Sequence, residues 1–170
     1  MTLPLRITEV SYFDNAYRGD LIITRGVLYY FPWVNVALEE KQSRDNQYER
    51  LFPLSFVIGF IWQLITAFGA AHAEPRLNQL GLWQEGQTDE ALQARLDSYI
   101  RTERTQPTQL MDYQYGLPHP MRFAAGEIKN LSLRSGLKFD TEFDTHDFGL
   151  SVFDSNELRG ALDEAGFVSE

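Results

Sequence analysis

Four side chains in one short stretch of the sequence could do chemistry. Asp140, Glu142, Asp144 and His146 alternate along the chain, and an extended strand points alternate residues to the same side. Carboxylate oxygens gathered in this way could bind a cation. The stretch lacks the glycine and the final glutamate of an EF-hand loop. A solvated strand face explains the same alternation, so we expect no metal and keep these four residues as the one candidate metal site.

Other catalytic signals are absent from the sequence. There is no cysteine, which excludes disulfides, thiolate catalysis and cysteine metal sites. The three histidines are isolated along the chain, and no HExxH, P-loop or GxSxG pattern occurs. The formal charge of −9 argues against a nucleic-acid-binding protein, which needs a basic surface. The sequence leaves enzymatic activity open but favours a non-catalytic protein without a cofactor.

The most unusual segment is a run of 23 residues, 51–73, that contains no Asp, Glu, Lys or Arg. A bilayer-spanning helix needs about 20 apolar residues. Pro53 suits the first turn of a helix, where its missing N–H is not needed. We therefore expect a hydrophobic helix in this run.

That helix would have two different sides. Small or polar residues recur every three or four positions and so form one stripe, which suits close packing against another helix. The stripe consists of Ser55, Gly59, Gln63, Thr66 and Ala70. The broad apolar side, which we expect to contact a membrane or a partner, carries Phe56, Phe60, Ile61, Trp62, Leu64, Ile65 and Phe68.

Three interpretations of the run stay open. It is a core helix of a soluble fold or oligomer, a helix lying in a membrane interface, or a membrane-spanning helix. A single crossing would place residues 1–50 and 74–170 on opposite sides of the membrane, so the two parts could not share one small domain. The N-terminus lacks a basic segment followed by an apolar stretch, so we expect a cytoplasmic protein, placed at the membrane face if the run contacts lipid.

Strands are predicted on both sides of this segment. Residues 5–13 are rich in β-formers, residues 14–20 are typical of a turn, and residues 21–24 and 27–31 flank a tight turn at Arg25-Gly26. Pro32 is expected to end the last of these strands. The C-terminal part predicts strands at 121–125, 128–133 and 137–143, and a last strand through Phe148, Leu150 and Val152. Leu137, Phe139 and Phe143 alternate with charged residues, as in a half-buried strand.

Two amphipathic helices complete the pattern. Thr88 is suited to cap a helix whose first turn carries Asp89 and Glu90. We expect this helix, near residues 89–101, to pack on the small stripe of the hydrophobic helix, with residues 74–87 as a loop between them. A terminal helix is predicted over residues 154–165, with Leu158 and Leu162 on its buried side and Gly166 at its end.

Two blocks of the sequence resemble GRAM and other pleckstrin-homology-like (PH-like) domains. They are GDLIITRGVLYYF at residues 19–31, and IKNLSL at 128–133 with LKF at 137–139, Phe148 and the final helix. The resemblance implies an α+β fold, namely a PH-like antiparallel β-barrel or sandwich with a C-terminal helix. The expected division is residues 1–50 and 106–170 for the strands and the terminal helix, with an inserted helical pair at 51–105.

Such domains are usually binding modules for lipids or proteins. We therefore expect a non-catalytic interaction module that associates with a membrane, or with a membrane-protein or oligomer partner, through its hydrophobic helix. The alternative is a soluble small-ligand-binding domain or enzyme whose insertion covers a pocket.

Overall fold

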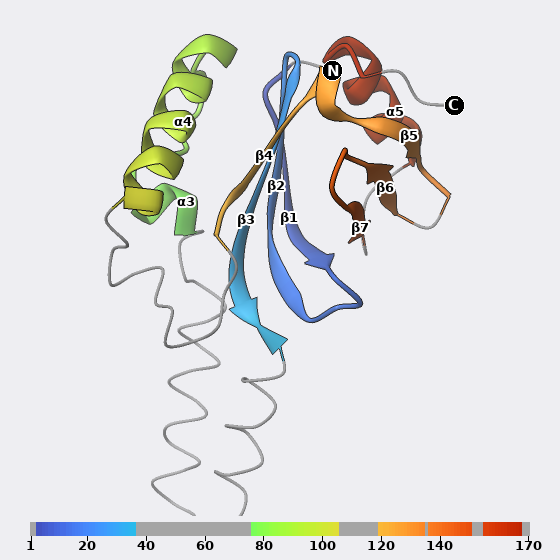
Figure 1. Ribbon diagram of the computed structural model, residues 1–170. Helices are drawn as coiled ribbons and strands as arrows, with labels where there is room; N and C mark the ends of the chain where they lie inside the picture. The colour runs from blue at the N-terminus through green and yellow to red at the C-terminus, as the bar shows by residue number, and fades with distance from the viewer. Residues whose placement is uncertain (1–2, 37–75, 106–118, 135, 151–154, 168–170) are drawn as a thin grey trace, which may run out of the picture. The chain divides into compact units, whose positions relative to one another are not determined.

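The computed structural model describes residues 3–36, 76–105, 119–134, 136–150 and 155–167 of the chain (Figure 1). One antiparallel sheet has the strand order β4-β3-β2-β1-β7-β6-β5. The strands are β1 (Leu5–Tyr12), β2 (Tyr17–Thr24), β3 (Val27–Asn35), β4 (Met121–Ala124), β5 (Lys129–Ser132), β6 (Leu137–Asp140) and β7 (Thr145–Gly149). The helices are α3 (Arg76–Gln79), α4 (Asp89–Thr105) and α5 (Ser155–Glu164), with a 3-10 turn, η3, at Ala125–Glu127.

The chain is α+β, as expected, but its sheet is open. Strands β4 and β5 lie at the two ends of the strand order and do not pair with each other. The 3-10 turn η3 follows β4 directly, and its first residue donates its backbone N–H to the carbonyl of Gly26. The chain therefore turns away from the free edge of β4 before β5 begins. The closed barrel is not formed by the described strands.

The first hairpins are longer than predicted. The turn between β1 and β2 is confined to residues 13–16, and β2 begins at Tyr17 rather than at Leu21. Strand β3 continues through Pro32 to Asn35. Proline is tolerated there because it faces Gly19 at a bulge, where the β2–β3 register shifts. A side chain at Gly19 would overlap the carbonyl of Phe31. The predicted turn at Arg25-Gly26 is confirmed, with Gly26 at φ +74°.

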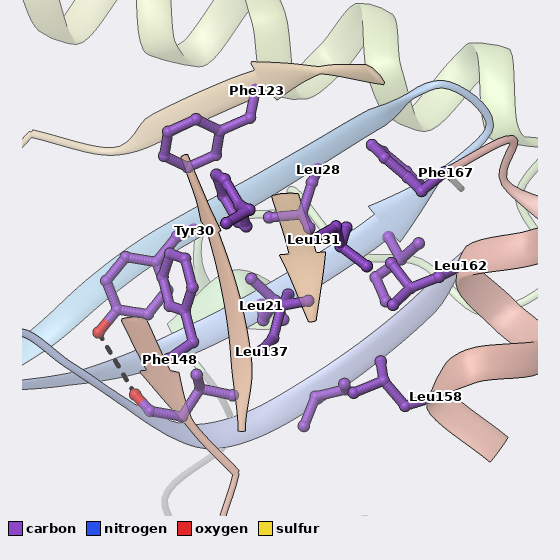
Figure 2. Close-up of a cluster of buried hydrophobic side chains, with 14 of the residues drawn as sticks. Leu21, Leu28, Tyr30, Phe123, Leu131, Leu137, Phe148, Leu158, Leu162 and Phe167 are labelled. Atoms are coloured by element: carbon purple, nitrogen blue, oxygen red, sulfur yellow. Dashed lines mark hydrogen bonds between the residues drawn. The ribbon is translucent and has the colours of Figure 1, made fainter. Parts of the chain in front are cut away.

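One apolar core lies between the inner face of the sheet and α5 (Figure 2). Leu21, Leu28 and Tyr30 point into it from β2 and β3. The remaining strands and α5 supply Phe123, Leu131, Leu137, Phe139, Phe148, Leu158, Leu162 and Phe167. The predicted buried side of the terminal helix is therefore confirmed, although its expected start at residue 154 lies outside the described residues.

Helix α5 ends as its sequence predicted. Gly166 has φ +86°, and its N–H bonds to the carbonyl of Asp163 while the N–H of Phe167 bonds to the carbonyl of Leu162. This is the Schellman arrangement, which satisfies the last helical carbonyls. The carbonyl of Ala165 accepts the backbone N–H of Gly26 at 2.7 Å. The C-terminal end of α5 is thus fixed to the β2–β3 turn.

Helix α4 covers the other face of the same strands. Ile22, Tyr29 and Phe31 alternate with the inner-core residues along β2 and β3, and all three are completely buried. The stripe of α4, namely Leu92, Leu96 and Ile100, is buried as well, and the rings of Phe31 and Tyr99 lie 6.1 Å apart. Figure 1 shows β2–β4 between α4 on one side and β5–β7 with α5 on the other. Strands that are buried on both faces have continuous apolar sequences, as residues 21–23 and 27–31 do.

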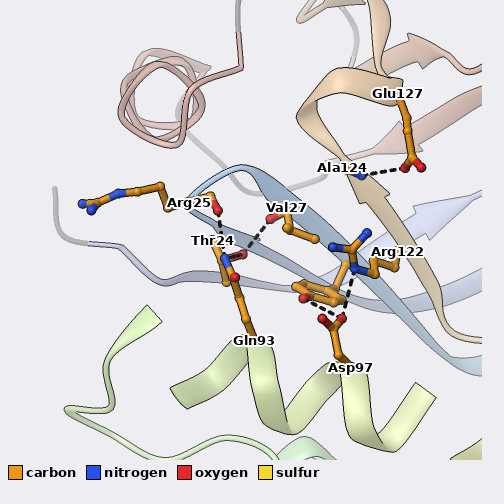
Figure 3. Close-up of polar contacts among 9 residues, drawn as sticks. Thr24, Arg25, Val27, Gln93, Asp97, Arg122, Ala124 and Glu127 are labelled. Carbon is orange, nitrogen blue, oxygen red and sulfur yellow. Dashed lines mark hydrogen bonds and ion pairs between the residues drawn. The ribbon is translucent and has the colours of Figure 1, made fainter. Parts of the chain in front are cut away.

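Polar bonds fix the position of α4 on the sheet (Figure 3). The amide of Gln93 donates to the Thr24 hydroxyl at 2.9 Å and to the Arg25 carbonyl at 2.8 Å. One turn further along, Asp97 accepts the Tyr29 hydroxyl at 2.9 Å and the Arg122 guanidinium at 3.0 Å. These partners come from β2, β3 and β4, so the helix is attached across three strands.

The expected packing of α4 on the hydrophobic run lies outside the described residues and stays a prediction. The chain divides into one compact unit made of residues 1–36 and 85–170 and a second made of residues 37–84. Helix α4 belongs to the first unit because its bonding partners are on the sheet. In the second unit, a short helix, α3, occupies part of the segment that we expected to be a loop. The carbonyl of Leu77 there accepts the N–H groups of Leu82 and Trp83.

Replacing Leu162 tests the inner core. Its side chain is fully buried, so Leu162→Ala should lower the free energy of unfolding by about 2–5 kcal/mol in urea melts. Gly160→Ala is the matched control on the same helix, because nothing lies within 4 Å of an added Cβ there. That change should stabilise the protein by about 0.5–1 kcal/mol. A loss below about half a kcal/mol for Leu162→Ala would contradict the packing of α5.

Replacing Asp97 tests the attachment of α4. Asp97→Ala leaves the buried Tyr29 hydroxyl without its acceptor, so we expect a loss of about 1–3 kcal/mol in urea melts. In a Tyr29→Phe background the same change should cost clearly less, because the hydroxyl is already gone. Equal losses in the two backgrounds would show that the bond does not hold the helix.

Candidate functional site

The predicted contact residues of the hydrophobic run lie outside the described residues. This holds for the apolar side, from Phe56 to Phe68, and for the small stripe, from Ser55 to Ala70. Among the helices that the structure does describe, none is long and apolar enough to cross a membrane. The membrane contact therefore stays a prediction.

The four candidate metal ligands do not lie on one strand, as their alternation had suggested. Strand β6 ends at Asp140, residues 141–144 form a turn, and β7 begins at Thr145. A turn breaks the period-two pattern, so the four side chains do not share one strand face. His146 is buried, while Glu142 and Asp144 are exposed. Within the described part of the chain, no group of three or more His, Asp or Glu side chains could hold a metal ion.

The turn itself is tightly hydrogen-bonded. The N–H and the hydroxyl of Thr141 both donate to the carbonyl of Asp144, at 2.8 and 3.0 Å, and the N–H of Asp144 donates back to that hydroxyl at 3.2 Å. Asp140 accepts the amide of Asn130 and the hydroxyl of Thr145 at its base. These two bonds hold the pKa of Asp140 below its ordinary value. The turn is therefore preorganised around an ionised carboxylate.

Phe143 stands at the tip of this turn with 91 % of its surface exposed. We expected it to be buried, because it continued the alternation of Leu137 and Phe139. Those two are buried, but the strand ends before Phe143 is reached. A rigid turn thus presents a large apolar side chain to solvent.

Behind the turn, His146 and Tyr12 form a buried pair. The Tyr12 hydroxyl lies 3.0 Å from Nδ1 of His146, and Nε2 of His146 lies 3.4 Å from the Thr141 hydroxyl. Since that hydroxyl donates to the Asp144 carbonyl, it accepts from Nε2–H. His146 is then the neutral Nε2–H tautomer, and the hydroxyl of Tyr12 donates to Nδ1. Both ring nitrogens are occupied, so the pair connects the core to the turn.

Burial sets the protonation of this pair. Desolvation lowers the pKa of His146, and the nearby carboxylates of Asp144 and Asp140 oppose this only in part. Desolvation, helped by Asp144, raises the pKa of Tyr12. Aromatic rings surround the imidazole, with Phe123 at 4.5 Å and Phe139 at 5.2 Å between ring centroids. Both groups are therefore neutral near pH 7.

The turn between β1 and β2 presents a second phenylalanine. Phe13, Asp14 and Asn15 all have left-handed backbone conformations, with φ of +54°, +51° and +63°. For most non-glycine residues this conformation costs roughly 1–2 kcal/mol, and an aromatic residue gains no local bond that would offset it. Phe13 is nevertheless 67 % exposed. Backbone strain of this kind often marks a functional turn.

The two turns lie at the same end of the sheet. Tyr12 pairs with Phe148 in the antiparallel β1–β7 ladder, so the residues before β7 continue past the end of β1. Strand β3 also ends here, since the N–H of Val36 bonds to the carbonyl of Ala16 at 3.0 Å. We call residues 12–16 and 140–147 the aromatic end. The C-terminal end of α5 is fixed to the β2–β3 turn, at the opposite end.

A buried ion pair links β1 and β2 away from this end. Arg6 on β1 lies 2.6 Å from Asp20 on β2, and both side chains are almost fully buried. Burial raises the pKa of Asp20, and Arg6 acts in the opposite direction. The pair is bonded within the sheet and does not point to a substrate.

We compared the chain with protein-family models, with curated proteins and with solved structures, and nothing matched in any of the three comparisons.

Sequence patterns missed most of the aromatic end. Tyr12 and His146 are 134 positions apart and meet only through the β1–β7 pairing. Phe13 was assigned to a strand and Phe143 to a buried face. The one available signal in the sequence was the acidic residue that follows each phenylalanine, Asp14 after Phe13 and Asp144 after Phe143.

Replacing His146 should change the pH dependence of stability. The folded-state pKa is lower than the ordinary 6.5, so the unfolded state binds the proton more readily and stability falls as pH decreases below about 6.5. The greatest slope for one proton is about 1.4 kcal/mol per pH unit. In urea melts from pH 5 to 7.5, His146→Gln should be less sensitive to acid than the wild-type protein.

The difference between wild type and His146→Gln gives the contribution of His146 to the pH dependence of stability. Asp20 has the opposite effect from His146, because its raised pKa makes stability fall as pH increases above about 4. Both proteins carry Asp20, so its contribution cancels in the difference. The same acid slope in wild type and His146→Gln would show that His146 is not the titrating group.

Proposed function

We propose that this chain is a non-catalytic, PH-like interaction module that is held at a membrane or membrane-protein complex by the hydrophobic run at residues 51–73. The observation that carries the proposal is the engagement of α4 with the sheet, because its bonds go to Thr24, Tyr29 and Arg122. The buried stripe of α4 is therefore used by the sheet. The run contains 23 residues without Asp, Glu, Lys or Arg, and we propose that lipid or a membrane protein covers its apolar side.

The remaining surface of α4 supports this argument. Apart from its buried stripe, the helix exposes Glu90, Ala91, Ala94, Ser98 and Arg101. This surface is polar or carries only small side chains, so it offers no second apolar stripe. A helix that is apolar around most of its circumference is buried in protein or lipid.

The order of elements supports the PH-like part of the proposal. Four strands are followed by three more and a terminal helix, and β1 pairs with both β2 and β7. The inserted segment leaves between β3 and β4, so the strands before and after it share one sheet. A single crossing at 51–73 would separate these strands. The run is therefore proposed to lie on the membrane or on a membrane-protein partner and not to span.

The non-catalytic part rests on the polar groups of the described residues. Two buried pairs are bonded to each other, namely Tyr12 with His146 and Arg6 with Asp20. Catalytic groups would instead converge on a space for substrate. No described feature favours the alternative of an enzyme or a soluble ligand-binding domain.

Fractionation of the expressed full chain tests the proposal. The wild-type protein should sediment with membranes, stay there in high salt and be released by detergent, because an acidic protein is held by apolar contact and not by charge. Phe60→Glu with Ile61→Glu should move the protein to the soluble fraction while circular dichroism keeps its strand signal.

The matched control is Ala91→Glu with Ala94→Glu, which adds the same charge to the exposed side of α4 and should leave the protein with the membranes. A wild-type chain that is a soluble monomer without detergent would overturn the proposal. Unfolding of the Phe60/Ile61 variant in that case would make the run an ordinary core helix.

A further inference from the structure

The aromatic end displays the two large apolar side chains that are exposed in the described part of the chain, Phe13 and Phe143. Neither exposure comes from a loose segment. Phe143 sits on a turn closed by three bonds between Thr141 and Asp144. Phe13 begins a run of three left-handed residues closed by the Ala16 N–H to the Phe13 carbonyl at 2.9 Å. Aromatic side chains on preorganised turns lose little conformational freedom on binding and are frequent anchors of interfaces.

Acidic residues flank both phenylalanines in the sequence. The aromatic end contains Asp14, Asp140, Glu142, Asp144 and Asp147 and no Lys or Arg. Asp147 pairs with Lys138 at 3.8 Å, where both side chains are more than half exposed, so that pair is weak. Asp14 and Glu142 are exposed. Exposed phenylalanines next to carboxylates favour a partner that combines apolar and cationic groups.

We propose that the aromatic end is a docking surface for a basic, apolar peptide segment of a partner protein, with Phe13 and Phe143 as anchors. Anionic lipid fits this surface poorly, because the carboxylates repel acidic headgroups. A peptide of about 12 residues spans up to roughly 40 Å when extended, so one segment can reach both turns. The proposal does not depend on the contact made by residues 51–73.

The experiment measures fluorescence anisotropy of labelled 12-residue peptides with the full chain in one non-ionic detergent buffer. The probe alternates lysine and leucine. The comparison peptides alternate lysine with serine, and glutamate with leucine. We expect the lysine–leucine peptide to bind and the other two to bind at least about tenfold more weakly. The lysine–serine peptide lacks apolar side chains, and the glutamate–leucine peptide lacks cationic ones.

Two variants of the chain assign the binding. Phe13→Ser with Phe143→Ser should weaken the lysine–leucine peptide at least about tenfold. Asp14→Asn with Glu142→Gln should weaken it and reduce its salt dependence. The control for charge is Glu157→Gln with Glu164→Gln on α5, which removes the same charge from exposed positions away from the aromatic end and should leave the affinity unchanged.

Several outcomes would overturn the proposal. They are no binding of the lysine–leucine peptide, unchanged binding by the phenylalanine variant, or an equal loss in the α5 control, which would indicate attraction by overall charge alone. Phosphatidylcholine vesicles provide the last arm, in the Phe60→Glu/Ile61→Glu background. If vesicle binding there depends on Phe13 and Phe143 and peptide binding does not, the surface contacts lipid instead of a peptide.

Failure here and failure of the proposed function are distinguishable. The Phe60/Ile61 variant should lose membrane sedimentation and keep peptide affinity. The Phe13/Phe143 variant should keep membrane sedimentation and lose peptide affinity.

Discussion

Burial of the β2–β3 hairpin on both of its faces is the constraint on which the described structure depends. Along residues 21–23 and 27–31, successive side chains face the α5 core and α4 in turn. Almost all of them are completely buried. A strand with two buried faces cannot change register without placing apolar groups in water. The hairpin therefore fixes the position of both helices, and each helix is attached to it by a short polar link, through Ala165 to Gly26 and through Gln93 to Thr24.

The same constraint separates the sheet into two ends with different properties. At one end, the C-terminal end of α5 and the β2–β3 turn are bonded to each other. At the aromatic end, the buried polar atoms of Tyr12 and His146 are bonded together, and the turns beyond them present apolar side chains to solvent. The buried Tyr–His pair supports the turn from behind, and the exposed aromatic side chains are the groups that our proposal assigns to binding.

The net charge of the chain and its uncharged run are related features. The net charge of −9 keeps the chain away from anionic surfaces at long range, so any membrane contact has to come from apolar side chains. In our proposal, the run at residues 51–73 makes that contact and the acidic aromatic end binds a basic segment of a partner. The protein would then hold the partner at the membrane.

The sequence by itself determined the elements whose signals are local. The Arg25-Gly26 hairpin, the Thr88 start of α4 and the Gly166 end of α5 follow from turn and capping residues that act within a few positions of each other. Strand alternation correctly placed Leu137 and Phe139 in the core, and helical spacing did the same for Leu158 and Leu162. The α+β class followed from the number and order of these elements.

Only the tertiary structure decided the rest. Pro32 stays within β3 because Gly19 on another strand leaves room for a bulge, and Phe143 is exposed because bonds among Thr141, Asp144 and Asp140 end the strand before it. Helix α4 packs on the sheet through contacts with residues more than 60 positions away in the sequence. His146 bonds to Tyr12, which is 134 positions away. Periodicity reports which side of an element is apolar, but the partner that covers that side is set by packing between segments distant in the chain.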